Sequence, residues 1–305
     1  METNAPKRTL EDVVREYSTP LSILAAGALI AMTMYYGPSN RGSSSVASAS
    51  TQSQLQEAVL PASGVTLPIT WGDLGAKMVE VGTIDPDKMA ALYRDRGGFP
   101  PEFKRMLEQN ANDKIVITSA NSGYLLNLLW ALGLTNKNPI LEDASEMMNP
   151  AYKGAGNFAS TGGWTLAKGN PTDHYNKHAL VMLTADQQAV VDRVSRNIYR
   201  PCCGNSTHFP DCNHGMAMLG LLELMASQGV SEQDMYKTAL AVNSYWFPET
   251  YLTIATYMQN RGTAWKDVFP QEMLSAKYSS SSGYASISSQ VTLPETKQGG
   301  GGCST

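Results

Sequence analysis

The thiol and imidazole side chains of this chain are concentrated in one short stretch. The 305 residues include four cysteines and four histidines, and five of these eight lie within the thirteen positions from 202 to 214. The stretch reads PCCGNSTHFPDCNHG over residues 201–215, and its candidate ligands are Cys202, Cys203, His208, Cys212 and His214. Thiolate sulfur and imidazole nitrogen bind zinc, copper and iron in proteins. The clustering therefore predicts a transition-metal site.

The spacing of the sulfur ligands bears on which ion is bound. Cys202 and Cys203 are adjacent, whereas the cysteine pairs of structural zinc sites are usually separated by about two to four residues. Two thioether residues, Met216 and Met218, follow the cluster directly. Soft sulfur donors select copper(I) and zinc. We therefore expect copper or zinc, with copper(I) favoured, and iron as a third candidate.

The other two histidines, His174 and His178, lie just upstream, and the 41 residues from His174 to His214 contain every histidine of the chain. If the segment DHYNKH is helical, the i, i+4 spacing places both rings on one face. The pair then joins the same ion or forms a second site. Both residues are therefore candidate metal ligands.

Two other interpretations of the cysteine and histidine cluster are open. A disulfide between Cys212 and Cys202 or Cys203 would close a short loop and stabilise a non-catalytic interaction module. Alternatively, Cys212 is the nucleophile of a thiol enzyme, with His208 or His214 as base. The predicted helix that begins just after Cys212 favours its thiolate. The sequence lacks a Cys-x-x-Cys motif and a Gly-rich nucleophile elbow, so metal binding is the main prediction and an enzyme activity is left open.

The elements that must position these residues are mainly helical. The cluster is predicted to form a loop between a helix that opens with the capping box of Thr184 and Gln187 and a second helix that starts near Asn213. Strand signals are few: Lys114 to Thr118 is the best β-branched run, and Ala179 to Leu183 is a second candidate. The predicted fold class is therefore a mainly α, helical globular domain with few short strands. Further helices are predicted over residues 71–81, 86–96, 101–109, 122–134, 235–247 and 248–258, and a long loop over residues 149–170.

The predicted domain organisation follows from two segments of unusual composition, an uncharged segment near the N-terminus and a Ser/Gly-rich tail. Residues 21–36 carry no charge, and residues 19–37 reach the length of a short transmembrane helix. The basic residues Lys7, Arg8 and Arg15 precede it, which places the N-terminus in the cytoplasm and the main domain outside; a cleaved signal peptide is the alternative. We therefore predict a cytoplasmic segment (1–18), a transmembrane anchor (19–37), a flexible linker (38–63), a helical extracytoplasmic domain (64–277) and a disordered Ser/Gly-rich tail (278–305).

The composition limits the classes of partner. The net charge is −4 and charged residues make up 16% of the chain, without a basic block. Nucleic acid is therefore not expected as a partner. The membrane is expected through the N-terminal helix, and a protein partner is left open. Four cysteines are too few to build a disulfide scaffold.

Three resemblances accompany the motif. The opening Pro201-Cys202-Cys203 resembles the Pro-Cys-Cys of the mitochondrial copper chaperones that feed cytochrome oxidase, which implies copper(I) binding by the adjacent cysteines. The region is also similar to the bacterial PCYCGC-motif proteins, which are extracytoplasmic, although here the order is Pro-Cys-Cys-Gly-Asn. From the anchor through residue 229 the chain looks most like uncharacterised membrane-anchored proteins of reduced-genome bacteria. That resemblance implies location and architecture without an activity.

Overall fold

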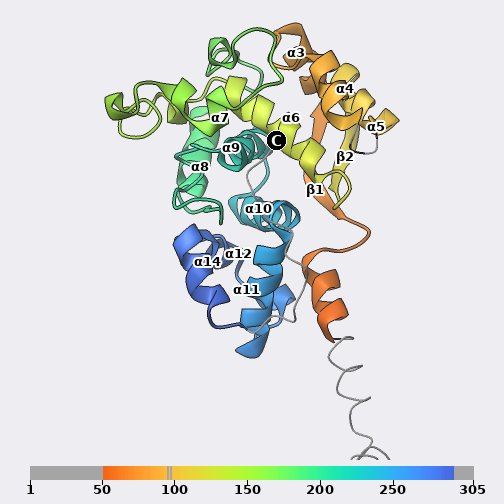
Figure 1. Ribbon diagram of the computed structural model, residues 1–305, viewed down its shortest axis with the longest axis vertical. Coiled ribbons are helices and arrows are strands. Elements are labelled where there is room, and N and C mark those ends of the chain that lie inside the picture. The colour runs from red at the N-terminus through yellow and green to blue at the C-terminus, as the bar shows by residue number, and fades with distance from the viewer. Residues whose placement is uncertain (1–50, 95, 97, 292–305) are drawn as a thin grey trace, which may run out of the picture. The chain divides into compact units, whose positions relative to one another are not determined.

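The computed structural model describes residues 51–94, 96 and 98–291. Contacts divide the chain into Met1–Gln52 and a compact unit, Ser53–Thr305. The described part of the compact unit is mainly helical with two short strands, as the sequence predicts (Figure 1). Its longer elements are β1 (Val65–Gly72), α3 (Leu74–Glu80), α4 (Pro86–Arg94), α5 (Pro101–Glu108), β2 (Ala111–Ile117), α6 (Ser122–Thr135), α8 (Ala185–Ser195), α9 (Asn213–Ser227), α10 (Glu232–Trp246), α11 (Pro248–Asn260) and α14 (Ser281–Ser288).

Short helical turns fill the intervals between these elements. The predicted long loop over residues 149–170 contains only single turns. In chain order the short elements are η1 (Pro139–Glu142), η2 (Pro150–Tyr152), η3 (Ala155–Asn157), α7 (Ala159–Gly162), η4 (Pro171–Asp173), η5 (Trp265–Asp267), α12 (Pro270–Met273) and α13 (Ala276–Ser279).

The ends of the compact unit differ from the predicted linker and tail. Residues 53–59 are helical, and Val59 is buried while Tyr245 donates to the Pro61 carbonyl, so the predicted linker is wrong over this part. The predicted disorder is likewise wrong over residues 278–291. There the Ser280 hydroxyl caps α14 and Ile287 is buried, which anchors a serine-rich helix that composition alone disfavours. Residues 292–305 are not described.

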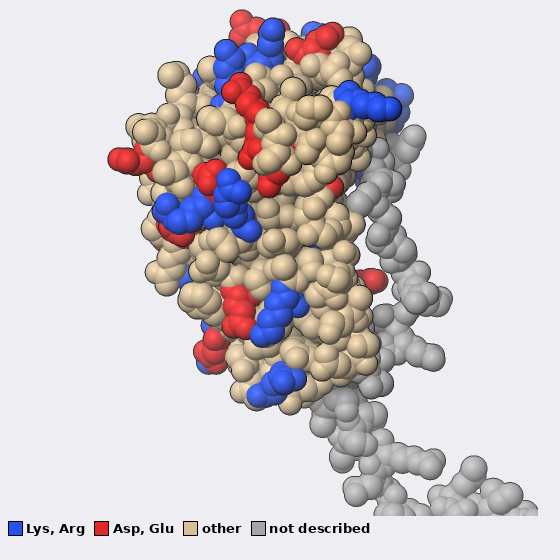
Figure 2. Space-filling view, turned by 90° about the vertical axis from the view of Figure 1, so that its left-hand side faces the viewer, with Lys and Arg blue, Asp and Glu red and all other residues tan. Residues whose placement is uncertain are grey.

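No helix within the described residues is long and apolar enough to cross a membrane. The predicted transmembrane anchor over residues 19–37, the cytoplasmic segment over residues 1–18 and the start of the linker all lie outside the described residues. On the face of the molecule beside α7, α8 and α14, acidic and basic side chains are interspersed among wide uncharged areas (Figure 2).

The two strands form an antiparallel pair, of which the sequence predicts only one member. The predicted strand over residues 114–118 corresponds to β2, but β1 is missed because Pro68 interrupts its β-branched run. The register shifts between Thr66 and Thr70, where Pro68 has no N–H to donate to the ladder. The second predicted strand, Ala179 to Leu183, is wrong: the backbone N–H groups of residues 180 and 181 donate to the side chain of Asn136 instead.

The centre of the domain is the crossing of α6 and α9, which lie side by side (Figure 1). Both helices are buried on nearly all sides, which is typical of core helices. The backbones approach closely at Gly133 and Gly220. A Cβ at Gly133 would lie 2.0 Å from the carbonyl oxygen of Met216, and one at Gly220 would lie 2.5 Å from that of Leu129. The fold therefore requires glycine at both positions, because any larger side chain would clash with the backbone of the other helix.

We predict that Gly133→Ala lowers the free energy of unfolding by about 1–3 kcal/mol or more, because the two helix backbones must separate to accept the methyl group. Gly123→Ala is the matched control, since Gly123 lies on the same helix and its Cβ would meet nothing within 4 Å. The control is expected to be neutral or stabilising by up to about 1 kcal/mol through helix propensity. Urea denaturation of both variants is the measurement, and equal effects would contradict the proposed close packing.

A second constraint on the core is the fully buried carboxyl group of Glu223 on α9. Its Oε1 accepts a 2.6 Å hydrogen bond from Asn138 Nδ2, while Oε2 has no partner. Asn138 also accepts from Gln188 of α8, at 2.9 Å, so the three side chains tie η1, α8 and α9 together. Burial raises the pKa of Glu223 to about 8, against the opposing hydrogen bond from Asn138.

This raised pKa predicts a pH dependence of stability. The folded state keeps the Glu223 proton up to about pH 8, whereas the unfolded chain releases it above a pKa of 4.5. The folded state thus binds more protons between these values, and stability should fall as the pH rises, by at most about 1.4 kcal/mol per pH unit. Glu223→Gln removes this contribution.

The measurement is the free energy of unfolding between about pH 5 and pH 8. The difference between the wild-type and Glu223→Gln profiles isolates this carboxyl from every other titrating group. Glu249→Gln, an exposed substitution on α11, is the control and should follow the wild type. Parallel wild-type and Glu223→Gln profiles would show that Glu223 does not hold a proton in the folded protein.

Candidate metal centre

The predicted cluster lies in a loop of residues 200–212 between α8 and α9, as the sequence indicates. The α8 helix begins with the predicted capping box of Thr184 and Gln187. Backbone hydrogen bonds then hold the loop against the domain: Thr207 N donates to Ile198 O at 2.8 Å, and Ser160 N donates to Asp211 O at 3.1 Å. The loop is therefore fixed from both of its sides.

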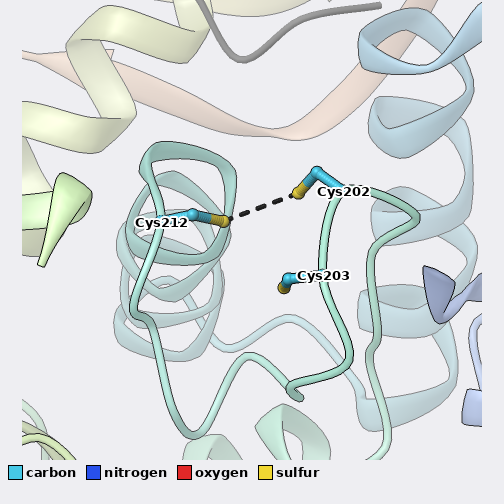
Figure 3. Close-up of side chains that lie close together, drawn as sticks. All are labelled: Cys202, Cys203 and Cys212. Carbon is cyan, nitrogen blue, oxygen red and sulfur yellow. Dashed lines mark hydrogen bonds between the residues drawn. The ribbon is translucent and has the colours of Figure 1, made fainter.

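Three sulfur atoms converge where this loop enters α9. The Sγ atoms of Cys202, Cys203 and Cys212 all lie within 4.8 Å of one another, and the Cys202 and Cys212 atoms are 3.6 Å apart (Figure 3). Cys212 is the residue that precedes α9, and the other two cysteines lie on the opposite limb of the loop (Figure 3). All three side chains are partly buried and carry free thiols. Cys303 lies outside the described residues.

The positive charge beside these sulfurs comes from Arg200, which the sequence interpretation did not include. Its side chain is fully buried and donates to Cys212 Sγ at 3.0 Å and to Asp211 Oδ1 at 2.5 Å. Two further hydrogen bonds go to the carbonyl oxygens of Asn205 and Phe209. The guanidinium thus joins both limbs of the loop. Burial alone would lower the pKa of Arg200, but Cys212, Cys203 and Asp211 outweigh it and keep the group charged.

Room for this guanidinium depends on the first turn of α9. A Cβ at Gly215 would lie 2.5 Å from both Cζ and Nη2 of Arg200. The motif therefore ends in glycine because the buried Arg200 side chain occupies the space that a Cβ at position 215 would need. One feature of the sequence could have indicated Arg200. It lies directly before Pro201-Cys202, next to a motif that contains an acidic residue and three thiols.

The three thiols differ in acidity. Hydrogen bonds from Cys202 and Cys203 to the Cys212 sulfur, with the nearby Arg200 guanidinium, lower the pKa of Cys212 well below that of an ordinary thiol, in spite of burial. The pKa of Cys202 is raised because its thiol proton is held in hydrogen bonds to the other two sulfurs and because it is buried. Cys212 is accordingly the most acidic thiol of the group.

His208 does not lie with the sulfur atoms. Its ring is buried between two carboxylates, with Nδ1 2.5 Å from Glu146 Oε2 and Nε2 3.0 Å from Asp192 Oδ2. The backbone explains this placement, because His208 N donates to Ser195 O at the end of α8. That bond turns the side chain toward Asp192, which lies one helical turn earlier.

His214 lies close to the sulfurs in sequence but faces the core. Its Nδ1 is 2.9 Å from Asn213 Oδ1, and its ring packs against Phe247 with the ring centroids 4.4 Å apart. Burial lowers the pKa of His214 to about 4. Among the described residues, the group of potential ligands within 4.8 Å of one another contains the three cysteines without His214 or His208.

His174 and His178 are paired with each other, with ring centroids 6.0 Å apart, but not on a helix. The predicted helical face is wrong: η4 ends at Asp173, and Asn176 has a left-handed φ of 53°. The chain turns here because the N–H groups of residues 176–178 cap the C-terminal carbonyls of α6 at Leu134 and Thr135. The structure groups neither histidine with the cysteines within 4.8 Å.

The comparisons with known proteins leave the site to be interpreted on its own geometry. No family model, no curated protein and no solved structure matches this chain.

The link between Arg200 and Cys212 predicts the reactivity of the thiols. In reduced, metal-free protein, iodoacetamide should label Cys212 at pH 6 faster than Cys202 or Cys203, because the thiolate is the reactive form. In Gly215→Ala the displaced guanidinium leaves the sulfur, and labelling of Cys212 should begin at higher pH. At a pH below the pKa of the thiol, each unit of increase in that pKa lowers the thiolate fraction about tenfold.

Peptide mapping by mass spectrometry follows the labelling of each cysteine separately. Gly204→Ala is the matched control, since it lies in the same loop and its Cβ would meet nothing within 4 Å. A pH profile of Cys212 that is the same in both glycine variants would contradict a role for Arg200 in its acidity.

Proposed function

We propose that this protein binds a transition metal through the thiolates of Cys202, Cys203 and Cys212, and that copper(I) is the favoured ion. The observation that carries the proposal is the convergence of three free thiols within 4.8 Å of one another. The uncharged segment over residues 19–37 supports a membrane anchor, and the basic residues Lys7, Arg8 and Arg15 before it support an extracytoplasmic location of the domain. The role would be metal handling, metal sensing or a structural clip.

The distances between the sulfur atoms suit a shared ion. A metal–sulfur bond of about 2.3 Å places the sulfurs of a trigonal site about 4.0 Å apart. The 3.6 Å between Cys202 and Cys212, and the 4.8 Å limit on all three pairs, require only small side-chain adjustments to reach this value. The loop is held by hydrogen bonds on both limbs, so the ligands are largely preorganised.

The number of ligands favours copper(I) over zinc. Zinc in structural sites takes four ligands, and no histidine or carboxylate of the described chain joins the three sulfurs within the same 4.8 Å. The nearest carboxylate, Asp211, is engaged with Arg200 and with Asn205. Three soft sulfur ligands alone are well suited to copper(I). Arg200 would offset part of the negative charge of the thiolates.

The short distance between two sulfurs also supports a second candidate, an interaction module with a Cys202–Cys212 disulfide. Their separation of 3.6 Å is about 1.5 Å longer than an S–S bond, so oxidation needs a modest movement. The third candidate, a thiol enzyme, has less support. His208 and His214 hydrogen-bond to Glu146, Asp192 and Asn213, and neither forms a hydrogen bond to Cys212 among the described residues.

The test is copper(I) binding by full-length protein purified reduced and without chelator. We expect about one equivalent of copper(I) per chain, and each of Cys202→Ser, Cys203→Ser and Cys212→Ser should weaken binding by about tenfold or more, because each removes one of three ligands. Competition with a chromophoric copper(I) chelator gives the affinity. X-ray absorption of the bound copper should report sulfur neighbours only.

His214→Gln is the control and should bind copper(I) like the wild type, because His214 is not grouped with the three sulfurs. Binding of less than a tenth of an equivalent by the reduced protein would refute the metal proposal. A quantitative Cys202–Cys212 bridge in protein isolated without reductant, found by non-reducing peptide mapping, would favour the interaction module instead.

A further inference from the structure

The buried imidazole of His208 belongs to a second group of potential ligands, separate from the sulfurs. The ligand atoms of Asp143, Glu146 and His208 all lie within 4.8 Å of one another. They come from two parts of the chain: Asp143 and Glu146 lie in the turn that directly follows η1, and His208 lies on the loop before α9. We propose that these three side chains bind a divalent metal cation of the manganese class. The proposal does not depend on the sulfur centre.

The composition of the ligand set indicates the kind of ion. Two carboxylates and one imidazole offer oxygen and nitrogen, which suit Mn²⁺, Fe²⁺ and Zn²⁺ and disfavour copper(I). His208 would bind through Nδ1, the nitrogen that faces Glu146. The cation would take the place of the proton that lies between Nδ1 and Glu146 Oε2, and that proton would be released to solvent.

The other nitrogen of His208 already has the partner that a metal-binding histidine needs. Its Nε2 lies 3.0 Å from Asp192 Oδ2, so that Nε2–H donates to a carboxylate while Nδ1 is directed at the ligand group. A carboxylate in this position fixes the tautomer and the orientation of a metal-bound imidazole. Only 2% of the His208 side chain is exposed, which restricts its rotation. Asp192 is therefore a positioning residue for the centre.

The charges balance for a divalent ion. Arg196 binds both oxygens of Asp192, at 3.0 and 3.2 Å, and so neutralises this carboxylate. Asp143 and Glu146 then leave two negative charges beside a neutral imidazole. Asp143 is held through Oδ1 by the backbone and hydroxyl groups of Ser145, and no hydrogen bond within the described chain engages its Oδ2. One oxygen of Asp143 is therefore free for a cation.

The centre opens into a groove, which leaves coordination positions for water or a small ligand. Asp143, Asp192 and His208 line this groove together with Ile140 and Gln188, and its volume is about 380 Å³. Glu146 is itself partly open to solvent, with 24% of its side chain exposed. A cation can therefore reach the ligands from solvent without opening of the core.

The test is the binding of Mn²⁺ alone to the full-length reduced protein, followed by the loss of the free-ion signal in electron paramagnetic resonance. We expect one saturable site. Asp143→Asn and Glu146→Gln should weaken binding by about tenfold or more, since each removes one charged ligand, and Asp192→Asn should weaken it by about 10- to 100-fold. Asp143→Asn retains the oxygen that accepts from Ser145, so it removes charge with little structural change.

Glu249→Gln, the same substitution at an exposed position on α11, is the control and should leave the affinity unchanged. Cys212→Ser should also bind Mn²⁺ like the wild type, and this separates the centre from the sulfur site. Thermal melts without metal identify any variant that does not fold. Absence of saturable Mn²⁺ binding, or equal affinity in Asp143→Asn and the wild type, would overturn the proposal and leave His208 as an ion-paired structural residue.

Discussion

The close approach of α6 and α9 is the constraint on which both candidate centres depend. Because Gly133 and Gly220 allow backbone contact, the two helices pack as one unit at the centre of the domain. Cys212 directly precedes α9, whose first turn provides the space for Arg200, while a later turn places Glu223 beside Asn138. The C-terminus of α6 leads directly into the segment with Asp143 and Glu146. A shift of one helix would displace the ligands of both centres.

Electrostatics explains why the loop between α8 and α9 has a defined structure in spite of its irregular backbone. Desolvation of a charge without partners is unfavourable by several kcal/mol, so a buried guanidinium must be surrounded by acceptors. Arg200 finds four, and these lie at positions 205, 209, 211 and 212. The chain must wrap around this one group to satisfy it, and in doing so it brings Cys212 back to Cys202. The convergence of the sulfurs is thus a consequence of the burial of one cation.

The sequence predicted those features whose causes are local. The starts of α4, α8 and α11 follow from Pro86, the Thr184 and Gln187 box, and Pro248, whose signals act within one turn. The convergence of the three cysteines was also accessible, because a loop of only eight residues separates Cys203 from Cys212 and Cys202 adjoins it. The sequence placed His208 with them on the same argument of proximity, and here proximity along the chain is misleading.

The partner of His208 could not be predicted, because it is decided by tertiary contacts. Glu146 lies 62 residues away along the chain, and no local pattern links the two. The hydrogen bond from His208 N to Ser195 O sends the imidazole along α8, whereas the preceding Cys203 and the following Cys212 remain with Arg200. The loop thereby separates two kinds of side chain. The three sulfurs lie beside the Arg200 guanidinium, and the imidazole of His208 lies between two carboxylates. This separation of the imidazole from the sulfurs is the reason why we propose two centres of different metal preference and not one mixed site.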